Sequence, residues 1–156
     1  MTIRMPRQRP LRLGDSRKDE VRTQFGALCW RRRAGEVEIL LVTSRGSKRW
    51  IIPKGWPVDR ATPAAAAETE AWEEAGVSGK VSPVCLGIYS YEKVVQGDER
   101  ASCVVAVFPL RVKSQSATYP EMKERKRKWI RQKKAAKMVA EPELAAIIAR
   151  FDPAMA

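Results

Sequence analysis

Residues 55–77 read GWPVDRATPAAAAETEAWEEAGV, and this segment limits the possible folds more than any other part of the chain. Thr62 can accept a hydrogen bond at a helix N-terminus, and Pro63 suits the first turn, where its missing N–H leaves no bond unmade. Four consecutive alanines then favour the helix, and Gly76 suits its end. The segment therefore predicts a helix over about residues 63–75.

Three glutamates lie close together on this expected helix. The spacing of Glu70, Glu73 and Glu74 places them on one helix face, where like charges repel each other. A solvated acidic face is one interpretation, and composition alone favours it. A divalent cation is the other, because Mg²⁺ binds a few carboxylates together with water and phosphate oxygens. The sequence on either side of the helix is the evidence that distinguishes the two interpretations.

The chain as a whole is strongly basic, with 30 Lys and Arg against 18 Asp and Glu and a net charge of +12 in 156 residues. Such an excess concentrates anions, so the partner could be nucleic acid, a phosphorylated small molecule or an anionic membrane surface. No apolar run approaches the roughly 18 residues that suggest a membrane span, and we expect no membrane partner. The chain has no histidine, which excludes Ser-His-Asp and Cys-His triads and zinc sites that use imidazole.

Cysteine usage indicates a reducing compartment. Cys29, Cys85 and Cys103 are odd in number and lack the spacing of metal ligands. Two of them lie in strand-like apolar runs, where buried reduced thiols are expected. We therefore predict a cytoplasmic location.

The order of segments predicts one layered α/β (α+β) domain behind a basic arm. Residues 1–19 are rich in Arg and Pro, have no periodicity and are expected to form a flexible arm. A single domain is expected over residues 20–153. Strand-like stretches with turns between them surround the helix described above. The stretch EPELAAIIARF spaces four apolar residues as one face of a C-terminal helix.

The helix and its flanks together resemble the signature of the Nudix hydrolases, G-x5-E-x7-R-E-U-x-E-E-x-G-U, in which U is a bulky apolar residue. IIPKGW precedes the helix and EEAGV closes it. The positions that match at the required spacing are Gly55, Glu70, Glu73, Glu74, Gly76 and Val77. The resemblance implies a Nudix-type α/β/α sandwich with a mixed central sheet, the signature helix and a C-terminal helix. It also implies an enzyme that uses Mg²⁺ or Mn²⁺ to hydrolyse a diphosphate linked to another moiety.

This resemblance implies specific roles for the carboxylates. Glu70 and Glu74 would be metal ligands, and Glu73 would be a ligand or the general base. The carbonyl group of Gly55 would add a further ligand. Some relatives add an acidic residue from a loop before the last helix, and the candidates here are Glu121 and Glu124.

Similarity beyond the signature indicates one branch of the family. ILLVTSRGSKRWIIPKG before it and ERKRKWI after it are similar to the diphosphoinositol polyphosphate and diadenosine polyphosphate phosphohydrolases. In that branch basic side chains outside the signature hold the polyphosphate, and Arg can bind phosphate oxygens in pairs. The candidate phosphate ligands in this chain are Arg22, Ser44, Arg45, Lys54, Arg100 and Arg127. Inositol pyrophosphates and dinucleoside polyphosphates therefore rank above nucleoside triphosphates and capped RNA as expected substrates.

Two signature positions differ, since the first Glu is Ala61 and the Arg is Thr69. A lone charge that faces a packed loop is costly, whereas removal of both partners can be nearly neutral. We therefore expect a retained metal site with altered loop support. On this interpretation Thr69→Arg alone should destabilise the protein more than the same change combined with Ala61→Glu. The departures also leave open a Nudix-fold binding or regulatory module with little catalysis.

A further alternative is an RNA-directed enzyme that trims a diphosphate-linked 5′ end, for which the basic arm would contribute strongly to binding. Nucleic acid is thus a partner that ranks below a small molecule. Residues 123–137 contain nine basic residues, which form either a solvated helix face or an electrostatic funnel for a polyanion. The metal-dependent hydrolase remains the first prediction, because all three glutamates of the signature helix are intact.

Overall fold

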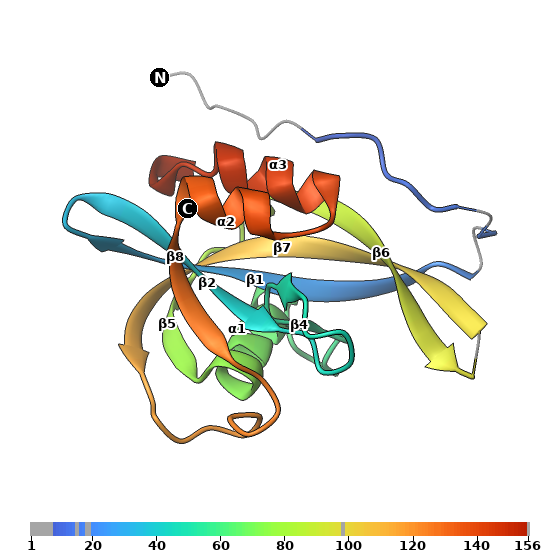
Figure 1. The fold of residues 1–156 in the computed structure, drawn as a ribbon, viewed down its shortest axis with the longest axis horizontal. Coiled ribbons are helices and arrows are strands. Elements are labelled where there is room, and N and C mark those ends of the chain that lie inside the picture. Colours follow the sequence, from blue (N-terminus) through green and yellow to red (C-terminus); the bar gives the residue numbers. More distant parts are fainter. Residues whose placement is uncertain (1–7, 15, 18–19, 98, 156) are drawn as a thin grey trace.

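The computed structural model describes residues 8–14, 16–17, 20–97 and 99–155. In this part of the chain eight strands form one mixed sheet, with helices on both of its faces (Figure 1). The long strand β7 (Glu99–Gln115) is parallel to β1 (Arg22–Arg33) and antiparallel to β5 (Val77–Val81) and β6 (Gly87–Gln96). The remaining strands, all in antiparallel pairings, are β2 (Glu36–Thr43), β3 (Trp50–Ile51), β4 (Lys54–Gly55) and β8 (Arg127–Arg131).

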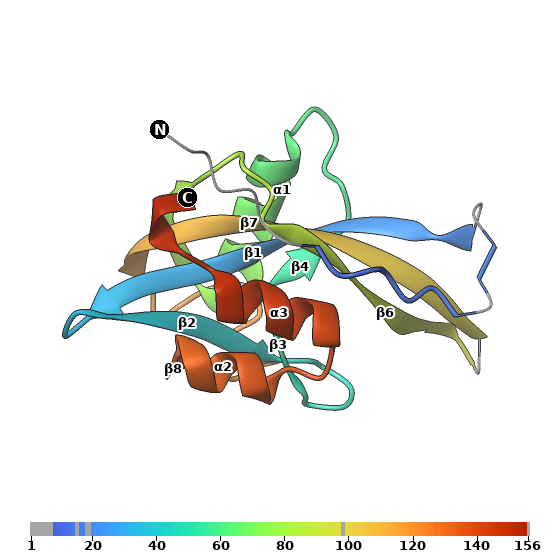
Figure 2. The same cartoon turned by 90° about the horizontal axis from the view of Figure 1, so that it is seen from above.

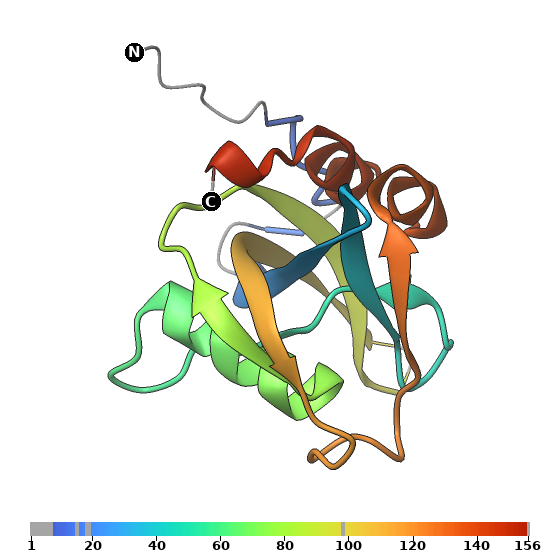
Figure 3. The ribbon, with the colours of Figure 1, turned by 90° about the vertical axis from the view of Figure 1, so that its left-hand side faces the viewer.

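Successive residues of the central strands point to opposite faces of the sheet, and different helices cover the two faces (Figure 3). Ala27 packs in the core under α1 (Pro63–Ala75), whereas Leu28 packs in the core under α3 (Pro142–Arg150). Helix α2 (Gln132–Met138) lies beside α3, as Figure 2 shows from above. The predicted α/β/α sandwich with a mixed central sheet is confirmed.

Helix α1 has the bounds that the sequence predicted. The Thr62 side chain accepts a hydrogen bond from the N–H of Ala65 at 3.1 Å. At the other end Gly76 has a φ of 66°, and its N–H donates to the carbonyl of Trp72 at 2.9 Å. Small buried alanines form the face toward the sheet, so the helix lies close to it. These contacts fix the direction in which the glutamates of α1 project.

Thr62→Ala is expected to lower the free energy of unfolding by about 1 kcal/mol, because the N–H of Ala65 loses its side-chain acceptor. Urea denaturation followed by circular dichroism measures this change. Thr69→Ala is the control, since the Thr69 hydroxyl donates to the Ala65 carbonyl, which lies inside the helix. Equal losses in the two variants would contradict a capping role for Thr62.

The described part of the N-terminal arm makes specific contacts with the domain. The side-chain amide of Gln8 pairs with the backbone of Ile88 in β6. Arg12 forms a salt bridge of 2.8 Å with the buried carboxylate of Glu143 in α3. Figure 1 shows the arm running along β6. Composition did not predict these contacts. The flexibility of residues 1–19 stays a prediction, and residues 1–7, 15, 18 and 19 lie outside the described residues.

Two segments form structure that the sequence did not indicate. Strand β5 was not expected, because VSGKV is short and polar; it forms along the C-terminal half of β7. The basic segment 123–137 is not one helix, since its middle forms β8 and only the residues from Gln132 onward are helical. Ile130 of β8 pairs with Ile39 and packs into the core. Sheet pairing here overrides the helix propensity of Lys and Arg.

The predicted C-terminal helix is confirmed as α3. Its buried residues Leu144, Ile147 and Ile148 pack in the core, and Phe151 follows directly after its end. None of the helices in the described residues has the length and apolar character that a membrane span requires.

Candidate active site

Helix α1 meets strand β4 at Gly55, which is buried. The carboxylate of Glu70 lies directly against the backbone there, since a Cβ placed on Gly55 would be 2.2 Å from Cδ of Glu70. Any side chain at position 55 would therefore displace this carboxylate. The signature spaces Gly55 and Glu70 at a fixed distance in the sequence, and the close packing of these two residues explains why position 55 is a glycine.

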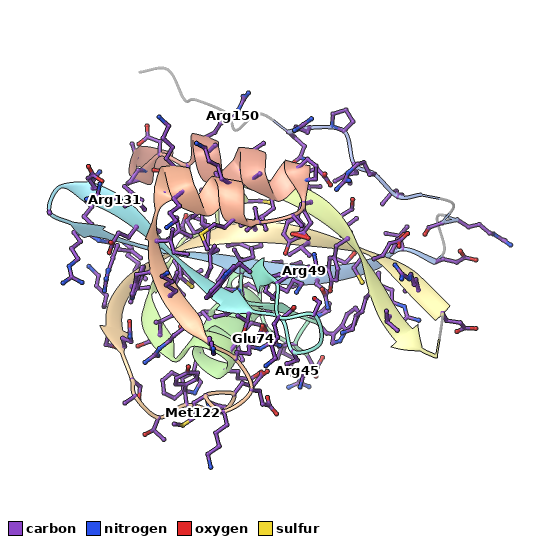
Figure 4. The ribbon with its side chains drawn as sticks, in the orientation of Figure 1. Arg45, Arg49, Glu74, Met122, Arg131 and Arg150 are labelled. Carbon is purple, nitrogen blue, oxygen red and sulfur yellow. The ribbon has the colours of Figure 1, made fainter. Side chains whose placement is uncertain are left out.

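Glu74 is the most buried glutamate of the signature, with 2% of its surface exposed. Its carboxylate oxygens lie 3.4 and 3.5 Å from the backbone nitrogen of Lys54, and Oε1 lies 3.5 Å from Nη2 of Arg125. Burial raises the pKa of Glu74 to about 7, although the charges of Arg125 and Lys54 act in the opposite direction. Figure 4 shows Glu74 on the α1 side of the sheet, opposite Arg150 of α3. A protonated and an ionised Glu74 are therefore both accessible near neutral pH.

The loop before β8 adds a fourth carboxylate. The N–H of Glu121 donates to the carbonyl of Glu73 at 2.9 Å, and Oε1 of Glu121 lies 3.0 Å from Nε of Arg125. Burial raises the pKa of Glu70, as do the charges of Glu73 and Glu121. Glu124, in contrast, is half exposed and pairs with a loop arginine. The structure therefore favours Glu121 over Glu124, and the carboxylate cluster consists of Glu70, Glu73, Glu74 and Glu121.

The raised pKa of Glu74 predicts a pH dependence for the stability of the metal-free protein. The folded-state value of about 7 lies above the ordinary 4.5, so the folded state binds more protons between these pH values than the unfolded state. The free energy of unfolding should therefore fall as pH rises from about 4.5 to 7, by up to ~1.4 kcal/mol for each pH unit in this interval. Urea denaturation in EDTA, repeated with Glu74→Gln, isolates this contribution. Parallel pH profiles for the two proteins would contradict it.

The donor set suits a hard divalent cation. Among the described residues, no three side chains of His, Cys, Asp or Glu lie together as a group that could hold a metal ion by themselves. Mg²⁺ does not require one, because it usually binds one or two carboxylates and keeps several waters. Two carboxylates are available here. Glu70 lies against Gly55, and the buried Glu74 lies beside the backbone of Lys54. The residues present therefore fit Mg²⁺ or Mn²⁺, and the assignment of individual ligands stays a prediction.

Lys54 is the predicted phosphate ligand that the structure brings to the carboxylate cluster. Its backbone nitrogen faces Glu74, and its ammonium lies 4.8 Å from the ring centre of Tyr91. Burial lowers the pKa of Lys54, and the nearby charge of Glu74 acts in the opposite direction. The ammonium thus lies over Tyr91, and its contact with a phosphate stays a prediction.

Arg22 and Arg100 lie together and line a cavity of about 510 Å³ near one end of β1. Arg100 also lines a second cavity of about 490 Å³, which reaches Tyr91 and which we call the arginine cavity. Arg12 and Arg49, which the sequence did not single out, line the arginine cavity as well. Each of its three arginines is paired with a carboxylate. No sequence pattern distinguishes Arg12 and Arg49 from the many other arginines, because only the folded chain brings them together.

The remaining predicted phosphate ligands have structural partners. The hydroxyl of Ser44 accepts a backbone N–H of its own loop at 2.9 Å. Arg45 is 63% exposed and lies 3.9 Å from a glutamate of the neighbouring loop. Arg127 donates to the carbonyl of Ala75 at 2.8 Å, where α1 ends, and its guanidinium lies over the ring of Tyr119. These contacts stabilise a loop and a helix end, and a phosphate role for these three residues stays a prediction.

The coupling expected between positions 61 and 69 rested on a wrong premise. Ala61 and Thr69 are both exposed, and so are all residues of the loop 56–62. An arginine at position 69 would extend into water and would not be buried against a packed loop. The destabilisation that we expected from Thr69→Arg alone therefore has no structural basis.

The sequence of this chain is similar to those of known proteins. Residues 22–151 match the family model described as the NUDIX domain. Nudix hydrolase 12, mitochondrial, from Arabidopsis thaliana is 32% identical over 106 residues, which cover 66% of this chain and 52% of that protein. Diphosphoinositol polyphosphate phosphohydrolase 3-alpha from Homo sapiens is 39% identical over 62 residues, or 40% of this chain and 37% of that protein.

The fold of the chain is also similar to solved structures. The crystal structure of C. elegans Ap4A hydrolase matches with a TM-score of 0.60 and 22% identity, over 87% of this chain and 99% of the other. This likeness concerns the fold alone. The chain spans about half the length of the Arabidopsis relative that it matches.

Proposed function

Because the chain belongs to the Nudix domain family, we propose that it is a metal-dependent hydrolase of diphosphate bonds. Nudix hydrolases generally use divalent metal ions. The observation that carries the proposal is the Glu70 carboxylate packed against Gly55, beside the buried Glu74. Several carboxylates held close together with little access to water are unfavourable alone, and a bound cation would compensate their charge.

The residues of the carboxylate cluster have distinct tasks in this proposal. Glu70, Glu74 and the carbonyl of Gly55 would hold Mg²⁺ or Mn²⁺, which when bound neutralises charge on the phosphate oxygens. Glu73, half-buried on the same helix, would accept a proton from the water whose oxygen attacks phosphorus. The bridging P–O bond then breaks, and the leaving phosphate takes the electron pair. Lys54 would stabilise negative charge beside the cluster.

We propose a polyphosphorylated small molecule as the substrate class. The arginine cavity reaches Tyr91, whose ring lies 4.8 Å from the ammonium of Lys54, and the backbone nitrogen of Lys54 faces Glu74 of the cluster. Its guanidinium groups have N–H donors beyond those used by their carboxylate partners, and these suit crowded phosphates. Inositol pyrophosphates and dinucleoside polyphosphates are the finer proposal. The local similarity to a protein named diphosphoinositol polyphosphate phosphohydrolase supports the first of them.

A cytoplasmic location also remains a proposal. It rests on Cys29 and Cys103, which are buried free thiols in the structure. The printed name of the Arabidopsis relative places that protein in mitochondria. Microscopy of the full chain carrying a fluorescent tag would decide between these two compartments.

A substrate panel with product identification tests the proposed function. The panel contains an inositol pyrophosphate, a dinucleoside polyphosphate, a nucleoside triphosphate and an RNA with a 5′ triphosphate, each with Mg²⁺ or Mn²⁺. We expect cleavage of a diphosphate bond in one of the first two compounds and no cleavage in EDTA. Tight binding without turnover in either metal would instead indicate a binding module. Preferred cleavage of the RNA, with a steep loss of affinity as salt rises, would indicate the RNA-directed enzyme.

A further inference from the structure

One arginine connects three parts of the candidate site. Nη1 of Arg125 donates to the carbonyl of Thr43 at the end of β2, at 3.0 Å. Its Nε lies 3.0 Å from Oε1 of Glu121, and its Nη2 lies 3.5 Å from Oε1 of Glu74. Only 9% of the Arg125 side chain is exposed. The guanidinium is therefore held in place by a strand end and by two carboxylates.

The cations that balance the glutamates of α1 have to come from other segments, because PAAAAETEAWEEA contains no basic residue. Lys54 contacts Glu74 through its backbone N–H, while its ammonium lies over the ring of Tyr91. Within the described residues, Arg125 is the side-chain cation that forms a salt bridge with Glu74. A planar guanidinium presents its N–H donors in a rigid fork that can hold two carboxylates at fixed angles, whereas an ammonium is a compact charge with rotatable donors.

We propose that Arg125 is a positioning residue of the candidate site. It holds the carboxylate of Glu74 in place for cation binding by tethering it to Glu121 and to the end of β2. Arg125 belongs to the loop before β8 and not to the signature helix, whose position 69 is an exposed threonine. The catalytic consequence rests on the proposed function, whereas the tether exists in the metal-free protein and can be tested there.

A direct contact with substrate is the rival interpretation. Arg125 also lines a cavity of about 360 Å³, together with Lys48, Lys123 and Lys126. A phosphate group in this cavity would meet the guanidinium from its exposed side. The two interpretations differ in kinetics: a lost substrate contact that is equal in ground and transition states raises KM, whereas misplaced catalytic groups lower kcat.

A double-mutant cycle on the metal-free protein tests the tether. Arg125→Gln in EDTA at pH 8 should lower Tm by roughly 5–10 °C, because it leaves the buried Glu74 without its cation. In a Glu74→Gln background the same change should lower Tm by less than about half as much. Lys128→Gln removes an exposed cation from β8 and is the matched control, with an expected shift below about 2 °C. Equal losses in both backgrounds would overturn the proposal, since Arg125 would then only pack the loop.

Steady-state kinetics with the substrate found in the panel separates positioning from substrate binding. Arg125→Gln should lower kcat by at least about tenfold and change KM by less than about threefold. Arg125→Lys should recover only part of kcat, because an ammonium is a compact charge without the rigid fork of donors that reaches Thr43, Glu121 and Glu74 together. A raised KM with unchanged kcat would overturn positioning and make Arg125 a substrate ligand. If the wild-type protein hydrolyses none of the substrates, the proposed function fails. The double-mutant cycle still tests whether Arg125 holds the carboxylate of Glu74.

Discussion

Glu74→Gln is expected to lower kcat by roughly 10³-fold or more. Glutamine keeps the shape of the side chain but removes the charge, so a divalent cation would lose its most buried carboxylate. Replacing a residue that only supports a metal ligand typically costs about 10–100-fold, and loss of a ligand should cost more. Steady-state assays of purified protein with Mg²⁺ and with Mn²⁺ measure the effect.

Glu68→Gln is the matched control for this substitution. Glu68 lies on the same helix but outside the carboxylate cluster, and the change should leave kcat within about twofold of wild type. The metal-free Glu74→Gln protein should also be no less stable than wild type at pH 8, because burial disfavours the ionised carboxylate. Similar losses of kcat in both variants would mean that Glu74 has no special role.

Gly55→Ala is expected to lower kcat by at least about 100-fold while the fold remains stable. The added Cβ would lie 2.2 Å from Cδ of Glu70, so the carboxylate has to move away from the backbone of β4. Because a carboxylate at the end of a flexible side chain can rotate, the stability cost should be small. A catalytic group displaced by about 1 Å can cost two orders of magnitude in rate.

Gly46→Ala is the control for a glycine that nothing crowds. A Cβ on Gly46 would have no neighbour within 4 Å, and the variant should behave as wild type. For Gly55→Ala, parallel measurements of Tm and of the Mn²⁺ dissociation constant should show a nearly unchanged Tm and weaker metal binding. Wild-type activity in Gly55→Ala would show that the position of the Glu70 carboxylate does not matter.

The features that the sequence predicted well are local ones. Helix α1 begins and ends where Thr62 and Gly76 place its caps, and the Nudix resemblance drawn from the same segment is confirmed by the family match. The spacing of Leu144, Ile147 and Ile148 likewise predicted the buried face of α3, since residues three and four apart share one side of a helix. Such features depend on a few consecutive residues.

The features that the sequence did not predict depend on contacts between distant segments. Arg125 stands in a run of four basic residues, and only the pairing of β8 with β2 directs its guanidinium toward Glu74. The pairing of Arg12 with Glu143 likewise requires the arm to lie against α3. Positions 61 and 69 were misjudged for the same reason, because no local pattern shows whether a loop covers them.

The most direct measurement is a crystal structure of the protein soaked in Mn²⁺, with anomalous diffraction used to locate the ion. We predict one peak at about 2.0–2.3 Å from carboxylate oxygens of Glu70 and Glu74, with Arg125 still in contact with Glu74 or Glu121. Glutamate side chains directed apart into solvent, with no anomalous peak between them at saturating Mn²⁺, would contradict it.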